Sequence, residues 1–330
     1  MIPQTGCGHA MAPNAKAALI ALAAFGLFAT HDVIVKRLGA DFSTFQILFF
    51  SVLFGFPLVT LTLIRDTDPG HLRPVHPWWT ATRTIAAVVT GGSAFYAFSV
   101  LPLAQTYAIL FAAPLLITLL SIPILGEPVR LRRWVAVIVG LCGVLVVLRP
   151  GATELELGHL AALVAASGSA VTSIIVRKIG QDERSVVLVL YPMLANFLVM
   201  GALLPFVFRP VGLEALALNG AIAVLGFAGA MLVVAAYKTG EAVVVAPMQY
   251  SQIIWATGYG ILFFDEVPDV ATLVGASIII ASGLYIVYRE SRADSSSRPV
   301  LKNRTRMDTA TQPRISALLR AMKNDREGPR

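Results

Sequence analysis

Val35-Lys36-Arg37-Leu38-Gly39, at the end of one apolar stretch, returns in the second half of the chain as Val176-Arg177-Lys178-Ile179-Gly180. Leu125-Gly126-Glu127-Pro128 returns in the same way as Phe264-Asp265-Glu266-Val267. Each copy of this repeat contains several apolar stretches. Such repeats are typical of membrane proteins assembled from two related halves, and they argue against a soluble enzyme.

The composition indicates the same class of protein. Of the 330 residues, 56% are hydrophobic and only 14% are charged, and the mean hydropathy is +0.74. So much apolar surface cannot be hidden in one soluble core. The apolar runs are about 18 to 23 residues long, which suits helices that cross a hydrocarbon layer of about 30 Å. We therefore predict an all-α integral membrane protein with ten transmembrane helices, at residues 15–35, 44–64, 80–100, 103–124, 131–148, 158–176, 186–208, 217–237, 242–264 and 270–288.

The ten predicted helices divide into two repeats of five. We expect a cytoplasmic N-terminal segment at 1–14, a first repeat at 15–150, a second repeat at 151–290, and a basic, disordered cytoplasmic tail at 291–330. Because five is an odd number, the second repeat should enter the membrane upside down relative to the first. From Arg289 onward the chain holds eleven basic and five acidic residues, which accounts for most of the net charge of +7. The basic character of the chain therefore does not indicate nucleic-acid binding.

The positions of the basic residues predict the orientation. If the N-terminus lies inside, the inner segments before the tail hold eleven Lys or Arg and the outer segments hold four. Basic residues concentrate in cytoplasmic loops, so both termini should be cytoplasmic in a multi-pass inner-membrane protein. The inner residues are Lys16, Arg65, Arg73, Arg83, Arg130, Arg132, Arg133, Arg177, Lys178, Arg184 and Lys238; the outer ones are Lys36, Arg37, Arg149 and Arg209.

Motifs of the common enzyme classes are missing from the sequence. There is no His-Glu-x-x-His pair, no Walker-type loop and no Gly-x-Ser-x-Gly. The two distant cysteines, Cys7 and Cys142, form neither a disulfide framework nor a metal-binding set. We expect no enzymatic activity, no cofactor, no metal and no nucleic-acid partner. The expected partners are a small-molecule substrate and membrane lipid, and self-association as a homodimer stays open.

Several motifs together resemble one family. Ala113-Pro114-Leu115 lies in the fourth predicted span, which ends in Leu125-Gly126-Glu127. The second half contains Val-Ala-Pro-Met-Gln-Tyr at Val245 to Tyr250 and closes on Gly-Leu-Tyr-Ile at Gly283 to Ile286. In this order the motifs resemble the EamA-type branch of the drug/metabolite transporter superfamily over roughly residues 15–290.

Within that branch, His31-Asp32 with Lys36 in the first span and Arg83 in the third look most like members that take up riboflavin or S-adenosylmethionine. The resemblance implies a secondary transporter of a small organic metabolite, first of all a vitamin such as riboflavin. Its cavity would lie between the two repeats and open alternately to each side. The alternatives are an S-adenosylmethionine transporter or amino-acid/metabolite exporter of the same fold, a lipid-linked sugar flippase, and a non-transporting structural membrane subunit.

The charged residues of the first and third spans have two interpretations each. Asp32 and Lys36 are four residues apart and share a helix face, so they could form an ion pair. Alternatively, Asp32 faces the cavity and binds substrate or a coupling proton, because intramembrane carboxylates are costly unless they are used. His31 is either a titrating group or a hydrogen-bonded structural histidine. Arg83 is either a topology anchor or a cavity residue that receives an anionic or carbonyl group.

Aromatic and amide side chains in the third, fourth and ninth spans suit a flat heteroaromatic ligand, although helix packing would use similar residues. Prolines in the fourth and ninth spans, including Pro114 and Pro247, are expected to break those helices beside a polar cavity, at positions that are not exact counterparts. The predicted substrate-binding residues are Asp32, Arg83, Tyr96, Gln105, Tyr107, Pro114, Gln249, Tyr250 and Trp255.

Overall fold

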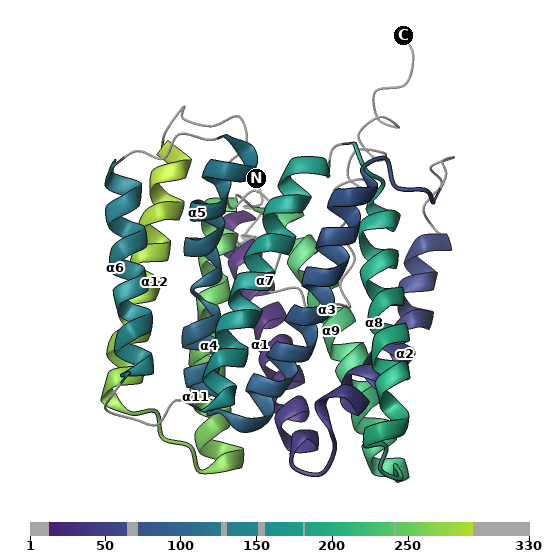
Figure 1. Cartoon of the computed structure of the whole chain (residues 1–330). Helices are drawn as coiled ribbons and strands as arrows, with labels where there is room; N and C mark the ends of the chain where they lie inside the picture. The colour runs from purple at the N-terminus through teal and green to yellow at the C-terminus, as the bar shows by residue number, and fades with distance from the viewer. Residues whose placement is uncertain are drawn as a thin grey trace, which may run out of the picture.

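The computed structural model describes residues 13–64, 72–126, 131–150, 156–180, 182–240 and 242–292. These residues form a helical bundle without a β-strand (Figure 1). Its long helices are α1 (Pro13–Gly39), α2 (Thr44–Ile64), α3 (Pro77–Val100), α6 (Leu131–Leu148), α7 (Leu157–Ile179), α8 (Ser185–Val207), α9 (Leu213–Thr239) and α12 (Val270–Arg292). Residues 1–12 and the predicted disordered tail after residue 292 lie outside the described residues.

Two further rods of the bundle are broken helices. α4 (Leu103–Leu110) ends just before α5 (Ala113–Leu125), and the short α10 (Ala242–Val245) leads through the 3-10 turn η1 (Ala246–Tyr250) into α11 (Ser251–Phe264). α5 begins fourteen residues before Glu127, and α11 begins fifteen residues before Glu266. The breaks thus fall at nearly matching places although the two prolines do not. If each broken helix is counted as one rod, the described residues form ten rods.

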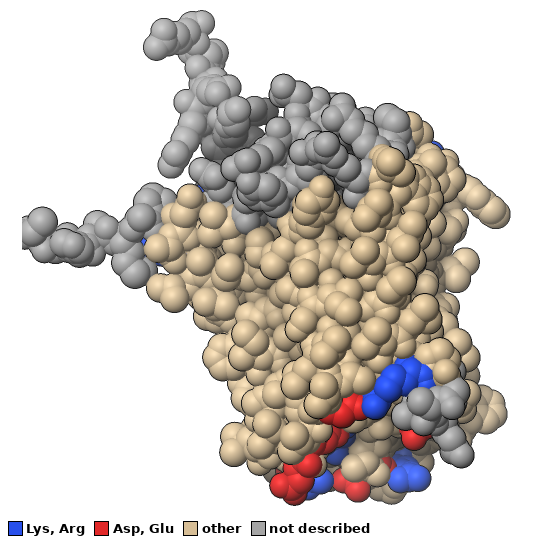
Figure 2. Space-filling model, turned by 90° about the vertical axis from the view of Figure 1, so that its left-hand side faces the viewer, with Lys and Arg blue, Asp and Glu red and all other residues tan. Residues whose placement is uncertain are grey.

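The outer surface of the bundle is suited to lipid. Within the described part of the chain, six helical segments are long and apolar enough to cross a membrane: Asn14–Gly39, Thr44–Leu61, Leu103–Leu125, Leu157–Ile179, Val186–Val207 and Leu213–Thr239. The shorter segments Trp134–Leu148 and Val270–Ile286 are also apolar. On the face shown in Figure 2, charged side chains gather at the lower end and leave a broad uncharged band above. The chain is therefore a multi-pass membrane protein, while the count of ten spans stays a prediction.

The helices pack in pairs that link the two halves of the chain. The most extensive pairs are α1 with α9, α3 with α7, and α6 with α12, followed equally by α2 with α8 and α5 with α7. Small residues permit close approach: a Cβ at Gly275 of α12 would meet the carbonyl oxygen of Gly143 of α6 at 2.7 Å. Such contacts replace the hydrophobic driving force that is missing between helices in lipid.

The first helices of the two halves run in opposite directions. The end of α1 and the start of α7 both meet the end of α3, because Gly39 lies against Ser99 and Gly158 lies against Leu101. We call the end of the bundle where they meet the lower end, as it is drawn in Figure 1.

Ion pairs join the connections at this lower end. Lys36 pairs with Glu266 of the α11–α12 connection at 2.7 Å, and Arg149 pairs with Asp269. His76 and Asp182 pair at the opposite end, at 3.3 Å. The uncharged band of Figure 2 lies between these two ends.

Candidate functional site

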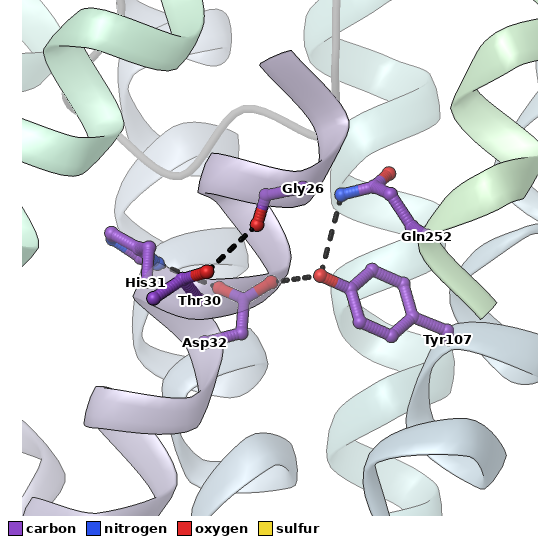
Figure 3. A network of polar contacts seen from close by, with 6 residues as sticks. All are labelled: Gly26, Thr30, His31, Asp32, Tyr107 and Gln252. Carbon is purple, nitrogen blue, oxygen red and sulfur yellow. Dashed lines mark hydrogen bonds and ion pairs between the residues drawn. The ribbon is translucent and has the colours of Figure 1, made fainter. Parts of the chain in front are cut away.

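A buried carboxylate on α1 is the centre of the candidate site. Asp32 is 2% exposed, and its Oδ1 lies 2.7 Å from Nδ1 of the neighbouring His31. Tyr107 of α4 donates its hydroxyl hydrogen to Oδ2 of Asp32, and Gln252 of α11 donates from Nε2 to the Tyr107 hydroxyl at 3.3 Å (Figure 3). The network therefore ties α1, α4 and α11 together through buried polar groups.

An aromatic pair adjoins the network on the same helices. Thr30 of α1 donates its hydroxyl hydrogen to the Gly26 carbonyl at 2.9 Å, and its oxygen lies 3.0 Å from the hydroxyl of Tyr259 (Figure 3 shows the first bond). Tyr259 stacks on Trp255 one turn earlier in α11, with ring centroids 6.2 Å apart. A Cβ at Gly26 would lie 3.3 Å from the Trp255 ring. Trp255 remains 39% exposed, which leaves part of its surface uncovered.

Tyr250 joins the network through packing rather than through hydrogen bonds. Its ring meets Phe111 edge-on at 5.1 Å, and Phe111 in turn lies 5.9 Å from Tyr107. Tyr250 is 6% exposed, and its hydroxyl faces Gly283, where a Cβ would lie at 1.9 Å. The break between η1 and α11 thus places this ring against both α12 and the end of α4.

A cleft of about 220 Å³ opens at the lower end, beside the network. Ala104 and Gln105 of α4 line one side, three and two residues before Tyr107, and Ala256 of α11 lines the other, four residues after Gln252. One helical turn therefore separates the cleft from the Tyr107–Gln252 hydrogen bond. Its lining residues are Pro102, Ala104, Gln105, Arg149, Ala256, Thr257, Gly260, Glu266, Val267, Pro268, Asp269 and Thr272.

An ion pair between Asp32 and Lys36 was one of the two interpretations of these residues, and the structure gives Lys36 another partner. Lys36 instead reaches the lower end, where it donates to the Leu101 carbonyl at 2.6 Å and pairs with Glu266. The other carboxylate oxygen of Glu266 accepts a hydrogen bond from the backbone N–H of Leu103 at 3.1 Å, at the start of α4. Glu266 is thus a residue that was not among the predicted site residues, although its place in the repeated motif was the available signal.

Arg83 lies on α3, and its contact is with α8. It is 4% exposed and donates to the carbonyl of Leu188. Pro192, four residues later in α8, has no N–H to offer that carbonyl. Arg83 therefore supplies a donor that the proline removes.

The other predicted site residues occupy different surroundings. Tyr96 is exposed on the surface of α3, whereas Phe95 beside it meets the His31 ring edge-on at 5.9 Å. Gln105 lines the cleft and lies 3.0 Å from Nε2 of His159 on α7. Pro114 is half-buried in the first turn of α5, and Gln249 is half-buried in η1. Of the predicted set, the structure brings Asp32, Tyr107, Tyr250 and Trp255 into one linked group around α1, α4 and α11.

The comparison with protein families places this group in context. The chain matches the EamA-like transporter family over residues 15–149 and again over residues 156–288. It belongs to that family. The resemblance drawn from the repeated motifs is thereby confirmed, and the two matches fall on the two halves whose helices form the group around Asp32.

Three curated relatives are named as transporters. The chain is 29% identical to the S-adenosylmethionine uptake transporter of Rickettsia bellii, over 80% of this chain and 91% of that protein. It is 27% identical to the pseudopaline exporter of Pseudomonas aeruginosa, over 80% and 93% of the two chains. It is 26% identical to the riboflavin transporter of Vibrio cholerae, over 76% and 89%.

A solved crystal structure shares the fold. It superposes with a TM-score of 0.56 at 20% sequence identity and covers 85% of this chain and 99% of the other. At this identity the likeness concerns the arrangement of the helices alone.

Proposed function

We propose that the chain is a secondary transporter of a small organic metabolite, working by alternating access between two inverted five-helix repeats. The observation that carries the proposal is the buried Asp32 carboxylate, held by Tyr107 beside the two helix breaks. Broken helices beside a polar site are how membrane transporters place backbone and side-chain groups around a solute. The antiparallel course of α1 and α7 and the pairing of helices across the halves support the inverted arrangement.

For the substrate, we favour an organic cation such as S-adenosylmethionine, and riboflavin is the second candidate. Asp32 offers a negative charge in a region from which water is excluded, where a cationic group would be a matching partner. Trp255 and Tyr259 offer aromatic faces near it, which suit either a cation or a flat ring system. Riboflavin is neutral and would use only the aromatic faces and the amide of Gln252.

The route to Asp32 is proposed to lead through the lower cleft. A cleft of about 220 Å³ is smaller than the roughly 300–1,000 Å³ of pockets that enclose a drug-sized ligand. A solute of that size therefore needs α4 and α11 to separate, which breaks the hydrogen bond between Tyr107 and Gln252. We place the lower end outside and both termini in the cytoplasm of the inner membrane, as the loop charges predict.

Transport by an Asp32→Asn variant tests the charge of the site. We expect the variant to bind S-adenosylmethionine more weakly by about 2 kcal/mol or more, so that the half-saturation concentration for uptake of the labelled solute into membrane vesicles rises roughly thirtyfold. Riboflavin uptake should be unaffected. Asparagine keeps the shape of the side chain, removes its charge and exchanges one acceptor oxygen for an NH₂ donor. Measuring each solute with and without an imposed proton gradient also shows whether the carboxylate carries the coupling proton, because the variant would then lose any pH dependence.

Asp41→Asn is the matched control, since it removes an exposed carboxylate at the lower end. Equal transport of both solutes by wild type and Asp32→Asn would overturn the charge assignment. Absence of any gradient-driven or exchange transport across a wider metabolite panel, with the protein inserted in the membrane, would favour the structural-subunit alternative.

A further inference from the structure

The lower cleft carries charges of both signs, which the network around Asp32 does not use. Arg149 follows α6, while Glu266 and Asp269 belong to the connection between α11 and α12, and all three line the cleft. Gln105 adds an amide from α4. A cleft with a guanidinium and carboxylates a few ångströms apart matches a ligand that itself carries both charges.

The two ion pairs of the cleft differ in how firmly they are held. Lys36 and Glu266 are 10% and 21% exposed, and each makes a further hydrogen bond to the backbone of another segment. Arg149 and Asp269 are 36% and 42% exposed. Exposed pairs contribute little to stability, because water screens them and competes for their hydrogen bonds. The pair of Arg149 and Asp269 is therefore the one that can exchange partners.

Arg149 shows two features of a residue kept for binding. Its backbone φ is 43°, in the left-handed region that residues other than glycine rarely adopt, and such conformations cluster at ligand sites. Its Nε is buried and has no hydrogen-bond partner among the described residues. Because a guanidinium can hold a carboxylate with two parallel hydrogen bonds, an entering carboxylate would satisfy this donor.

We propose that the lower cleft is an outer binding site for a zwitterionic α-amino-acid group, in which Arg149 takes the carboxylate and Asp269 takes the ammonium. The volume of about 220 Å³ suits one polar end of a metabolite rather than a whole cofactor-sized molecule. The site rests on the proposed function and narrows its substrate class, because S-adenosylmethionine ends in such a group and riboflavin does not.

Gln105 is positioned to complete the site. The backbone N–H of Glu156 donates to Nδ1 of His159 at 3.1 Å, so the proton of the neutral imidazole lies on Nε2. That N–H points to the Gln105 amide, which is best assigned with its oxygen toward His159. The NH₂ group of Gln105 is then free to donate to the carboxylate of the ligand.

Direct binding to the purified full-length protein in detergent tests the site without requiring transport. The probes are L-methionine, its methyl ester, which lacks the carboxylate charge, and N-acetylmethionine, which lacks the ammonium charge. On wild type we expect L-methionine to bind roughly ten- to hundredfold more tightly than either derivative, as charged hydrogen bonds do. Arg149→Gln should erase only the difference in affinity between L-methionine and its methyl ester. Asp269→Asn should erase only the difference in affinity between L-methionine and N-acetylmethionine.

The variants are chosen so that folding does not confuse the result. Asp269 accepts a hydrogen bond from the backbone N–H of Thr272 at 2.8 Å at the start of α12, and asparagine caps a helix about as well as aspartate. Arg149→Lys keeps the positive charge but lacks the two parallel N–H donors of the guanidinium, so it should bind L-methionine with intermediate affinity. The controls, Arg37→Gln and Asp41→Asn, remove exposed charges at the same end and should behave as wild type.

The proposal is overturned if L-methionine binds no more tightly than its derivatives, or if each variant weakens all three probes alike. This failure is separable from failure of the proposed function, which is read from vesicle transport. If the protein takes up riboflavin but does not bind L-methionine selectively, it is a transporter, and the proposal of this outer site is wrong.

Discussion

The proposed function depends on a few single side chains. Asp32 is held by two neighbours of different chemistry, an imidazole and a phenol, and is 2% exposed. Such burial of a carboxylate is expensive in a membrane protein unless the group is used. Trp255, in contrast, keeps 39% of its surface exposed next to this network. We propose that a solute bound at Asp32 also contacts the exposed part of this ring.

Replacement of Trp255 by alanine tests whether the ring contacts the solute. If it stacks on the ligand, Trp255→Ala should cost about 1–3 kcal/mol, or roughly ten- to hundredfold in half-saturation concentration. Trp134→Ala is the matched control, because Trp134 is 38% exposed on α6. Initial rates of vesicle uptake, corrected for the amount of inserted protein, give the answer. Unchanged kinetics in Trp255→Ala would assign the ring to helix packing.

Arg83 is expected to matter for stability through the carbonyl of Leu188. Arg83→Met should lower the unfolding free energy by about 1–3 kcal/mol, because it leaves that buried acceptor without a donor. Adding Pro192→Ala restores a backbone N–H four residues later and should recover part of the loss. Thermal unfolding in detergent of the two single variants and the double variant measures the coupling. Strictly additive effects would mean that Arg83 does not serve this carbonyl.

Glycines allow some pairs of helices to pack at short distance. Between α6 and α12, a Cβ at Gly275 would meet Val147 at 2.5 Å and the backbone oxygen of Gly143 at 2.7 Å. Backbone cannot move aside as the end of a side chain can, so the two helices would have to separate. The same pair of helices carries Arg149 and Asp269 at its lower end. The close packing of α6 and α12 thus lies next to these two residues that line the cleft.

Gly275→Ala should therefore destabilise the protein by about 1–3 kcal/mol through overpacking. Gly258→Ala is the matched control, because nothing lies within 4 Å of a Cβ at this position of α11. The control should be neutral or slightly stabilising, since alanine favours helix by about 1 kcal/mol over glycine. Melting temperatures in one detergent compare the two. Equal melting temperatures would show that α6 and α12 pack less closely than the structure has them.

The whole molecule is a bundle in which helices of one half of the chain pair with helices of the other half. α1 of the first half pairs with α9 of the second, and α7 of the second pairs with α3 of the first. This pattern is what two repeats of opposite orientation produce when they interlock. These shared interfaces are what the proposed alternating access would have to rearrange.

Reporter fusions test the orientation of this bundle. A reporter after Ser291 and a reporter within residues 66–75 should both be cytoplasmic, whereas one after Arg209 should be external. The reason is the excess of basic residues in the segments assigned to the inside. A periplasmic signal after Ser291 or within residues 66–75 would contradict the inverted ten-span topology.

The amino-acid sequence alone determined the class of the protein and its family. Apolar runs of membrane length and the repeated motif around Lys36 are local features, so they can be read without a structure. The motifs around Pro114 and Glu127 then led to a family that the two separate matches confirm. Asp32 could also be selected from sequence, because a carboxylate inside an apolar run stands out against its neighbours.

Only the tertiary structure decided which side chains meet. Tyr107 and Gln252 are 145 residues apart, and their contact with each other and with Asp32 depends on how three helices are rotated about their axes. Lys36 joins Glu266 rather than Asp32, because the α11–α12 connection brings a second carboxylate to the lower end. Arg149 and Asp269 meet for the same reason. A period of 3.6 residues tells which face of one helix is polar, but the partner of that face is chosen by long-range packing.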